Sequence, residues 1–193
     1  MHLLKNVRLS YPALFAPSAF GDGEPKFNAT FLIKKDSETH KALMEEIKRV
    51  AKEAFGDKAR SVVEKQEASQ RKLIKDGDGP DGQTQDGEQK DGYEGHIAIK
   101  ASNKAAPKVV GRQRQPLTEA DGIPYGGCYV NAQIDIWAQD NKYGKFLNVK
   151  LLAVQFWEDG DAFGSAARAD LDAFDADDDG DSNSDTGSGG AAW

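Results

Sequence analysis

The sequence is poor in cysteine and histidine, the residues that cross-link a fold through disulfides or metal ions. It also has no long apolar run. It contains one cysteine, Cys128, and three widely separated histidines, His2, His40 and His96. An internal disulfide is therefore excluded, and no spacing suits a structural zinc site. No stretch approaches the ~20 apolar residues of a membrane span, and the first residues lack the pattern of a secretion signal. We expect a cytoplasmic protein that needs no cofactor.

The motifs of common enzymes are also missing. The sequence has no GxxxxGK[ST] phosphate loop, no GxGxxG, no HExxH and no GxSxG. The acidic run Asp175–Gly180 matches the first half of a calcium loop, but Thr186 stands where such a loop needs a bidentate glutamate. The sequence therefore indicates a binding protein that is not an enzyme and holds no metal.

Acidic and basic residues are distributed unevenly along the chain. The net charge is −7, yet residues 158–193 carry eleven acidic side chains against Arg168 alone, which gives −10 there and leaves +3 for residues 1–157. The same segment is rich in Gly, Ser and Asp, a composition typical of disorder. We predict a folded domain over residues 1–157 and a disordered acidic tail over residues 158–193. Because the tail supplies the negative excess, the low isoelectric point does not exclude nucleic-acid binding by the domain.

Alternating apolar and polar residues predict a mainly β domain. The clearest strand is Tyr129–Ala138, in which every second residue from Val130 to Ile136 is apolar. Residues 36–56 have helical spacing and end at a glycine, whereas residues 76–95 hold five Asp-Gly pairs and predict a flexible loop. About six mostly antiparallel strands with one principal helix fit an OB-like small barrel. The other expected strands are 3–9, 26–34, 96–101, 108–115 and 145–157.

The second half of the domain combines positive charge with aromatic residues. Between Gly95 and Trp157, eight basic residues stand against four acidic ones. Single-strand binding requires this mixture, because cations neutralise phosphates while aromatic rings stack on bases. The alternative interpretation is that the cations are solvated and the rings lie in the core. The candidates for phosphate contact are Lys100, Lys104, Arg112 and Arg114, and those for stacking are Tyr129, Trp137 and Tyr143.

The acidic tail ends in an aromatic residue, Trp193. A segment that served solubility alone would not need a tryptophan at its carboxyl end. Asp177, Asp178, Asp179 and Trp193 are therefore candidate contacts to a partner protein that offers an apolar pocket beside a basic patch.

Segments spread over nearly the whole chain carry a family resemblance. They are LKNVRLSYPALFAP, KFNATFLI, KDGDG, EGHIAIKASN, PKVV, YGGCYVNAQIDIWAQDN and the acidic end. In this order and spacing, the sequence resembles the phage single-stranded DNA-binding proteins. The resemblance implies an OB-fold that coats DNA during phage replication, recombination or repair in the host cytoplasm. It also implies an acidic tail that contacts replication proteins such as a polymerase or helicase-primase.

Two other functions remain open from the sequence. The chain could be an acidic adaptor or DNA mimic whose anionic surface binds a host protein. It could also be a metal-dependent nuclease that uses the carboxylates of residues 76–91. The sequence leaves open whether the chain forms a homo-oligomer.

Overall fold

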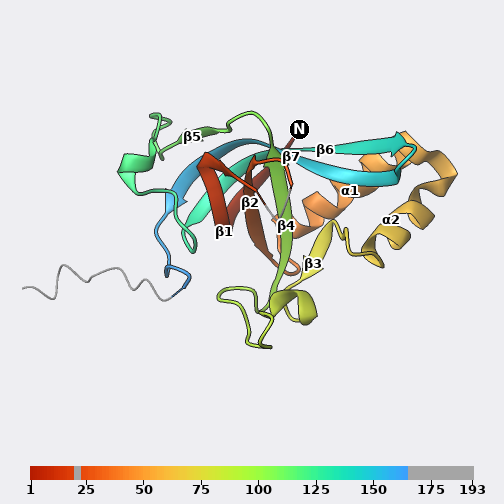
Figure 1. The fold of residues 1–193 in the computed structure, drawn as a ribbon, viewed down its shortest axis with the longest axis horizontal. Coiled ribbons are helices and arrows are strands. Elements are labelled where there is room, and N and C mark those ends of the chain that lie inside the picture. Colours follow the sequence, from red (N-terminus) through yellow and green to blue (C-terminus); the bar gives the residue numbers. More distant parts are fainter. Residues whose placement is uncertain (20–22, 165–193) are drawn as a thin grey trace, which may run out of the picture.

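The computed structural model describes residues 1–19 and 23–164, and its strands and helices are shown in Figure 1. The strands are β1 (His2–Ser18), β2 (Lys26–Lys34), β3 (Ile74–Asp76), β4 (His96–Asn103), β5 (Lys108–Val110), β6 (Tyr129–Asn141) and β7 (Gly144–Glu158). The α-helices are α1 (Glu38–Phe55) and α2 (Ala59–Glu67), and short 3-10 turns cover Gly56–Lys58, Pro80–Gly82 and Glu119–Asp121.

Five of the strands close into a barrel. β1 pairs antiparallel with both β2 and β6, β2 pairs with β4, and β6 pairs with β7. A parallel pair between Ser102 of β4 and Lys150 of β7 closes the ring. The order β1-β2-β4-β7-β6 is that of an OB-fold. The predicted fold class is therefore confirmed, with β3 added beside β4 and β5 beside β7.

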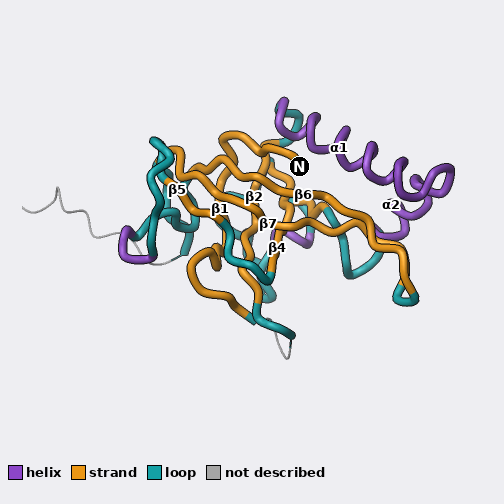
Figure 2. Tube along the Cα trace, turned by 90° about the horizontal axis from the view of Figure 1, so that it is seen from above, coloured by secondary structure: helices purple, strands orange, loops and turns teal. Residues whose placement is uncertain are grey.

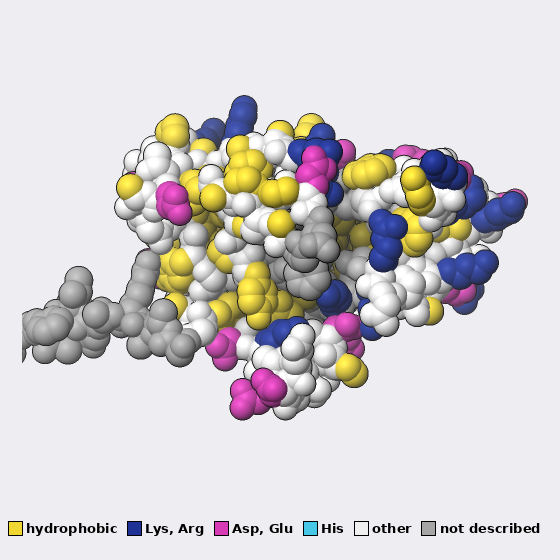
Figure 3. Space-filling model, in the orientation of Figure 1, with side chains coloured by type: hydrophobic (Ala, Val, Ile, Leu, Met, Phe, Trp, Pro, Cys, Tyr) yellow, Lys and Arg dark blue, Asp and Glu magenta, His cyan; other side chains and the backbone are white. Residues whose placement is uncertain are grey.

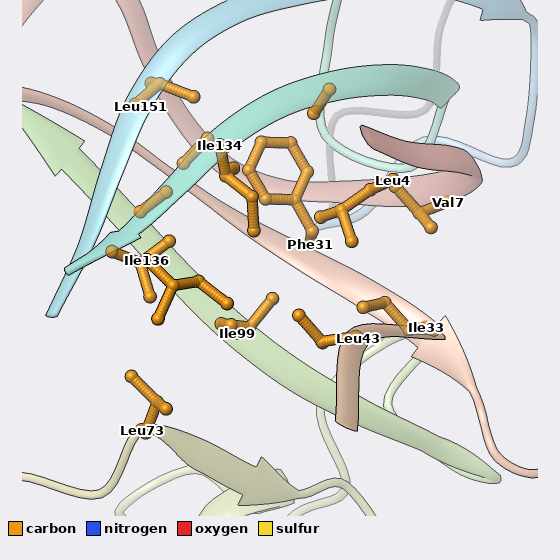
Figure 4. Packing of buried hydrophobic residues seen from close by; sticks show 14 of the residues in the cluster. Leu4, Val7, Phe31, Ile33, Leu43, Leu73, Ile99, Ile134, Ile136 and Leu151 are labelled. Atoms are coloured by element: carbon orange, nitrogen blue, oxygen red, sulfur yellow. The ribbon is translucent and has the colours of Figure 1, made fainter. Parts of the chain in front are cut away.

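The alternation that predicted the strands also defines the core. In β6, Val130, Ala132, Ile134 and Ile136 are buried. They meet apolar residues of the other barrel strands, such as Phe31, and Figure 4 shows Phe31, Ile99, Ile134 and Leu151 converging inside the barrel. Because successive residues of a strand point to opposite faces, the intervening positions are left for the outer surface.

Helices α1 and α2 lie together on one side of the strands (Figure 2). The side chain of Ser37 accepts a hydrogen bond from the backbone N–H of His40 and starts α1, and Gly56, at φ 55°, ends it. The apolar face of α1 buries Leu43 and Ile47 in the main core. None of the helices in the described part of the chain is both long and apolar enough to cross a membrane.

The Asp-Gly segment 76–95, predicted as a flexible loop, makes several contacts with the rest of the domain. The ammonium of Lys35 contacts Asp76 at 2.5 Å and Asp78 at 2.6 Å, and Lys72 contacts Asp81 at 2.6 Å. These contacts lower the pKa of the Asp76 and Asp78 carboxyls and raise that of the Lys72 ammonium, because each carboxylate accepts a hydrogen bond from a cation. Three of the carboxylates that the nuclease alternative would use, Asp76, Asp78 and Asp81, are thus paired with lysines.

Candidate nucleic-acid interface

The outer face of β2 and β4 forms the floor of an open groove. Thr30 of β2 lies opposite Lys100 of β4, and both point away from the barrel interior. One wall comes from residues 71–75 with Lys90 and Tyr93, and the other comes from residues 147–149 of β7. This central groove has a volume of about 580 Å³. In OB-folds generally, oligonucleotides bind over the second and third barrel strands, which are β2 and β4 here.

A second depression continues the central groove toward the end of β4. It has a volume of about 380 Å³ and is lined by Lys26, Lys104, Trp137 and Lys150, among others. Ser102, Asn148 and Val149 line both depressions. We call the second one the distal groove; together the two form one channel across the barrel.

The channel is strongly basic. Eight of its lining residues are cations, and only Asp81 and Asp135 are acidic. Asp81 is paired with Lys72, and Asp135 lies 3.2 Å from the amino terminus. Figure 3 shows dark-blue Lys and Arg side chains around the hollow between the lower loop and the lobe at the right. The lining cations are Lys26, Arg71, Lys72, Lys75, Lys90, Lys100, Lys104 and Lys150.

Three large aromatic side chains are exposed near the channel. Trp137, 44% exposed, lines the distal groove, and Tyr11, 63% exposed, lines the central groove. Tyr143, 71% exposed, lies in the β6–β7 turn with the ammonium of Lys142 5.0 Å from its ring centre. In other OB-folds the loop between the fourth and fifth barrel strands contributes to oligonucleotide binding, and this turn is its counterpart.

A backbone irregularity in β1 explains why Tyr11 is exposed. The pairing of β1 with β2 shifts register between Ser10 and Ala13, and Tyr11 has φ 45°. Leu9 and Ser10 are both buried, so the simple alternation fails just before Tyr11. β-Bulges of this kind re-aim a side chain, and here the ring is directed into the groove.

Lys100, Lys104 and Trp137 are the predicted site residues that the structure brings together. Lys100 lies in the central groove, and Lys104 and Trp137 lie in the distal groove. The ammonium of Lys104 is 2.7 Å from Glu24, whose pKa this hydrogen bond lowers. Tyr143 lies at the hairpin tip and lines neither groove.

The structure places Arg112, Arg114 and Tyr129 elsewhere. The Arg112 guanidinium lies 4.8 Å from the ring centre of Trp157, and Arg114 lines a separate apolar depression beside Leu3. Tyr129 carries the guanidinium of Arg8 at 5.5 Å from its ring centre. Tyr129 and Trp137 share one face of β6, but eight residues of strand separate them by roughly 26 Å. The alternation of apolar and polar residues shows that two residues share a face of a strand. It does not show that residues at opposite ends of the strand belong to one site.

The predicted site residues did not include Tyr11 or six of the eight lining cations, which are Lys26, Arg71, Lys72, Lys75, Lys90 and Lys150. A usable signal was present, because Arg71, Lys72 and Lys75 place three cations within five residues. Apart from Lys150, the missed residues precede the basic and aromatic stretch Gly95–Trp157 that predicted the interface. Lys90 lies in a segment rich in aspartate, whose composition does not indicate a basic site.

The partner-binding predictions for Asp177, Asp178, Asp179 and Trp193 lie outside the described residues. The structure does describe residues 158–164, the start of the predicted tail, and it places them against the barrel. The backbone N–H of Phe163 donates to the carbonyl of Gly126 at 2.9 Å.

A closed five-stranded OB barrel with a basic, aromatic channel over its second and third strands defines a class of oligonucleotide-binding proteins. Residues 2–184 match the family described as the ssDNA-binding protein of Enterobacter phage Enc34, and the chain belongs to this family. Because this is a family of binding proteins, the prediction that the chain is not an enzyme is confirmed.

Individual proteins similar to this chain support the family assignment. A protein of Acyrthosiphon pisum secondary endosymbiont phage 1, named putative protein p50, is 40% identical over 179 residues, which cover 89% of this chain and 91% of the relative. The solved ssDNA-binding protein of bacteriophage Enc34 in complex with ssDNA is 33% identical, covers 84% of this chain and 88% of its own, and superposes with a TM-score of 0.64. The bacteriophage T7 protein gp2.5 is 14% identical with a TM-score of 0.52, covers 88% of this chain and 96% of its own, and supports the fold alone.

Proposed function

We propose that this chain binds single-stranded DNA, largely without sequence preference, in the channel formed by the central and distal grooves. The observation that carries the proposal is the lining of that channel, in which eight cations and two exposed aromatic rings cover the face that OB-folds use for oligonucleotides. The family of phage ssDNA-binding proteins supports the same function.

The chemistry of the channel suits a flexible strand better than a duplex. Lysine ammonium groups along both grooves neutralise consecutive phosphates, while Trp137 and Tyr11 offer ring faces to bases. Base–aromatic stacking contributes about 1–3 kcal/mol per base and tolerates any sequence. Tyr143 and Lys142, in the β6–β7 turn, extend the interface along the strand.

We also propose that the acidic tail regulates this site. Its −10 charge makes it a competitor for the basic channel, and its aspartates with Trp193 form the contact to a replication protein such as a polymerase or helicase-primase. The protein would then coat and protect single strands in the host cytoplasm during phage replication, recombination or repair. Deletion of Trp193 alone should weaken capture of the purified partner while ssDNA affinity stays unchanged.

A fluorescence titration with oligothymidylate at two salt concentrations tests the function. Stacking on Trp137 should quench tryptophan emission, and phosphate contacts should make the affinity fall as salt rises. Trp137→Phe is the matched control, since binding should persist with most of the quenching lost. Absence of binding at both salt concentrations would reject the proposal and favour the acidic adaptor.

A further inference from the structure

Residues 159–164 dock on the barrel through several independent contacts. Arg8 of β1 donates through one terminal nitrogen to the carbonyl of Asp161 at 2.8 Å, and its guanidinium lies 4.5 Å from the Phe163 ring centre. The backbone N–H of Gly164 donates to the carboxylate of Asp91 at 3.0 Å. Both the backbone of residues 159–164 and the side chain of Phe163 therefore contact the barrel domain.

Two glycines make room for this segment. A Cβ at Gly92 would collide with the Phe163 ring, and a Cβ at Gly127 would collide with the carbonyl of Asp161. Both glycines also have positive φ, at 74° and 106°. The docking site is thus shaped by residues of the Asp-Gly loop and of the turn before β6.

The ring of Phe163 packs on β2 and β4, the two strands whose outer face also forms the floor of the central groove. It joins a small apolar cluster made of Leu32, Tyr93 and Ala98. Leu32 and Ala98 are paired across β2 and β4, and the next outward pair along the same strands is Thr30 with Lys100. Two residues of strand span about 7 Å, so Phe163 docks immediately beside the groove.

Phe163 also shares neighbours with the groove. Gly164 and Phe163 line a depression that includes Tyr11, Lys90 and Tyr93, and these three residues line the central groove as well. Gly164, the last residue described at this end of the chain, therefore lies in a depression that adjoins the Tyr11–Lys90 end of the channel. From residue 165 onward the chain carries eight acidic side chains and one arginine, a charge of −7.

We propose that residues 159–164 are an anchor that fixes where the acidic tail begins, so that its carboxylates enter the DNA channel from the Tyr11–Lys90 end. This inference rests on the proposed competition between tail and DNA. It makes Phe163 a positioning residue for autoinhibition that contributes no DNA contact of its own.

The size of the effect follows from the length of the tether. Asp170 is six residues beyond Gly164 but twelve beyond Glu158, where β7 ends. For a tether of the predicted disordered kind, effective concentration falls roughly as the −3/2 power of its length. Release of the anchor should therefore weaken competition by Asp170 about threefold, and competition by Asp175 and the aspartates beyond it by about 1.5- to twofold.

The test compares ssDNA affinity at low salt in four proteins: the full chain and its 1–164 truncation, each with and without Phe163→Ala. The tail effect is the ratio of the two dissociation constants within each pair. We expect Phe163→Ala to reduce that ratio about twofold and to leave the affinity of the truncated protein unchanged. Leu3→Ala, which changes an exposed apolar residue that lines neither groove of the channel, is the control and should leave the ratio unchanged.

The other outcomes separate the inference from the function on which it rests. An unchanged ratio, or no tail effect in the starting pair, would overturn the anchor. Equal weakening of binding in both backgrounds would also overturn it, because Phe163 would then only support the groove wall at Tyr93. If none of the four proteins binds ssDNA, the proposed function itself fails.

Limited chymotrypsin digestion provides a readout that needs no DNA. A docked Phe163 should resist cleavage in the full chain, and Arg8→Gln should expose the bond after Phe163 by removing the stacked guanidinium. Rapid cleavage after Phe163 in the unmodified protein would contradict the docked anchor, whatever the DNA affinities.

Discussion

The helical face and the channel face carry similar numbers of cations, but they use them differently. On α1 and α2, Lys41, Lys48, Arg49 and Arg60 each contact a carboxylate three or four residues away at 3.2 Å or less. In the channel, most of the lining cations make no ion pair with any carboxylate of residues 1–19 and 23–164. Overall charge therefore does not identify a nucleic-acid interface. We infer the interface instead from cations that lack carboxylate partners and gather around a concave surface.

The largest effect should come from neutralising the channel cations. The triple variant Lys75→Gln/Lys100→Gln/Lys150→Gln should lower ssDNA affinity on the order of 100-fold at low salt, because three phosphates lose their counter-charges. The slope of log affinity against log salt should fall by about 2, at ~0.7 per phosphate on a single strand. The matched control is Lys41→Gln/Lys48→Gln/Arg60→Gln on the helices. Similar losses in the two triple variants would show that the two faces do not differ in function.

The next largest effect is on stability, and it concerns Gln66, which links helix α2 of the helical face to β7 of the channel face. Gln66 of α2 is buried, donates to the carbonyl of Leu147 at 2.8 Å and accepts from the N–H of Leu147 at 2.7 Å. Gln66→Ala leaves both backbone groups unpaired and should lower the free energy of unfolding by about 1–3 kcal/mol. Urea denaturation measures this change. Gln70→Ala, at an exposed position after the same helix, should stay within about 0.5 kcal/mol of the parent.

Removal of a stacking ring should have a smaller effect than the triple charge change. Trp137→Ala should weaken binding to oligothymidylate and oligodeoxyadenylate by a similar factor of about 10, since stacking contributes 1–3 kcal/mol per base without reading it. Isothermal titration with both oligonucleotides checks this expectation. A loss confined to one base would mean that Trp137 takes part in sequence recognition.

The smallest effect is expected from the cations that lie outside the channel. Arg112→Gln with Arg114→Gln should change ssDNA affinity by less than about threefold, because one guanidinium stacks on Trp157 and the other borders a separate depression. The same titration measures it. A loss comparable to that of the channel variant would place a second DNA path on this side of the barrel.

The sequence predicted the barrel better than it predicted the site. Alternation from Val130 to Ile136 depends only on the local period of a strand, and the structure buries those residues as expected. The site depends on which strand segments meet across the barrel, and this information is non-local. Lys100 and Lys150 are fifty residues apart in sequence, yet both line the channel. Tyr11 was missed because its exposure comes from a register shift in β1 that composition does not reveal.

The closure of the barrel has a consequence for the mechanics of the free and bound protein. β4 and β7 are joined by the single parallel pair Ser102–Lys150, supported by a hydrogen bond from the Asn103 side chain to the carbonyl of Leu151 at 2.9 Å. This seam runs beneath the channel, with Lys100 on one side of it and Lys150 on the other. A strand that binds both lysines spans the seam and opposes its opening, because a ligand that binds only the closed form stabilises that form. Under the proposed binding mode DNA would hold this seam closed, and amide hydrogen exchange along β4 and β7 should slow when ssDNA is added.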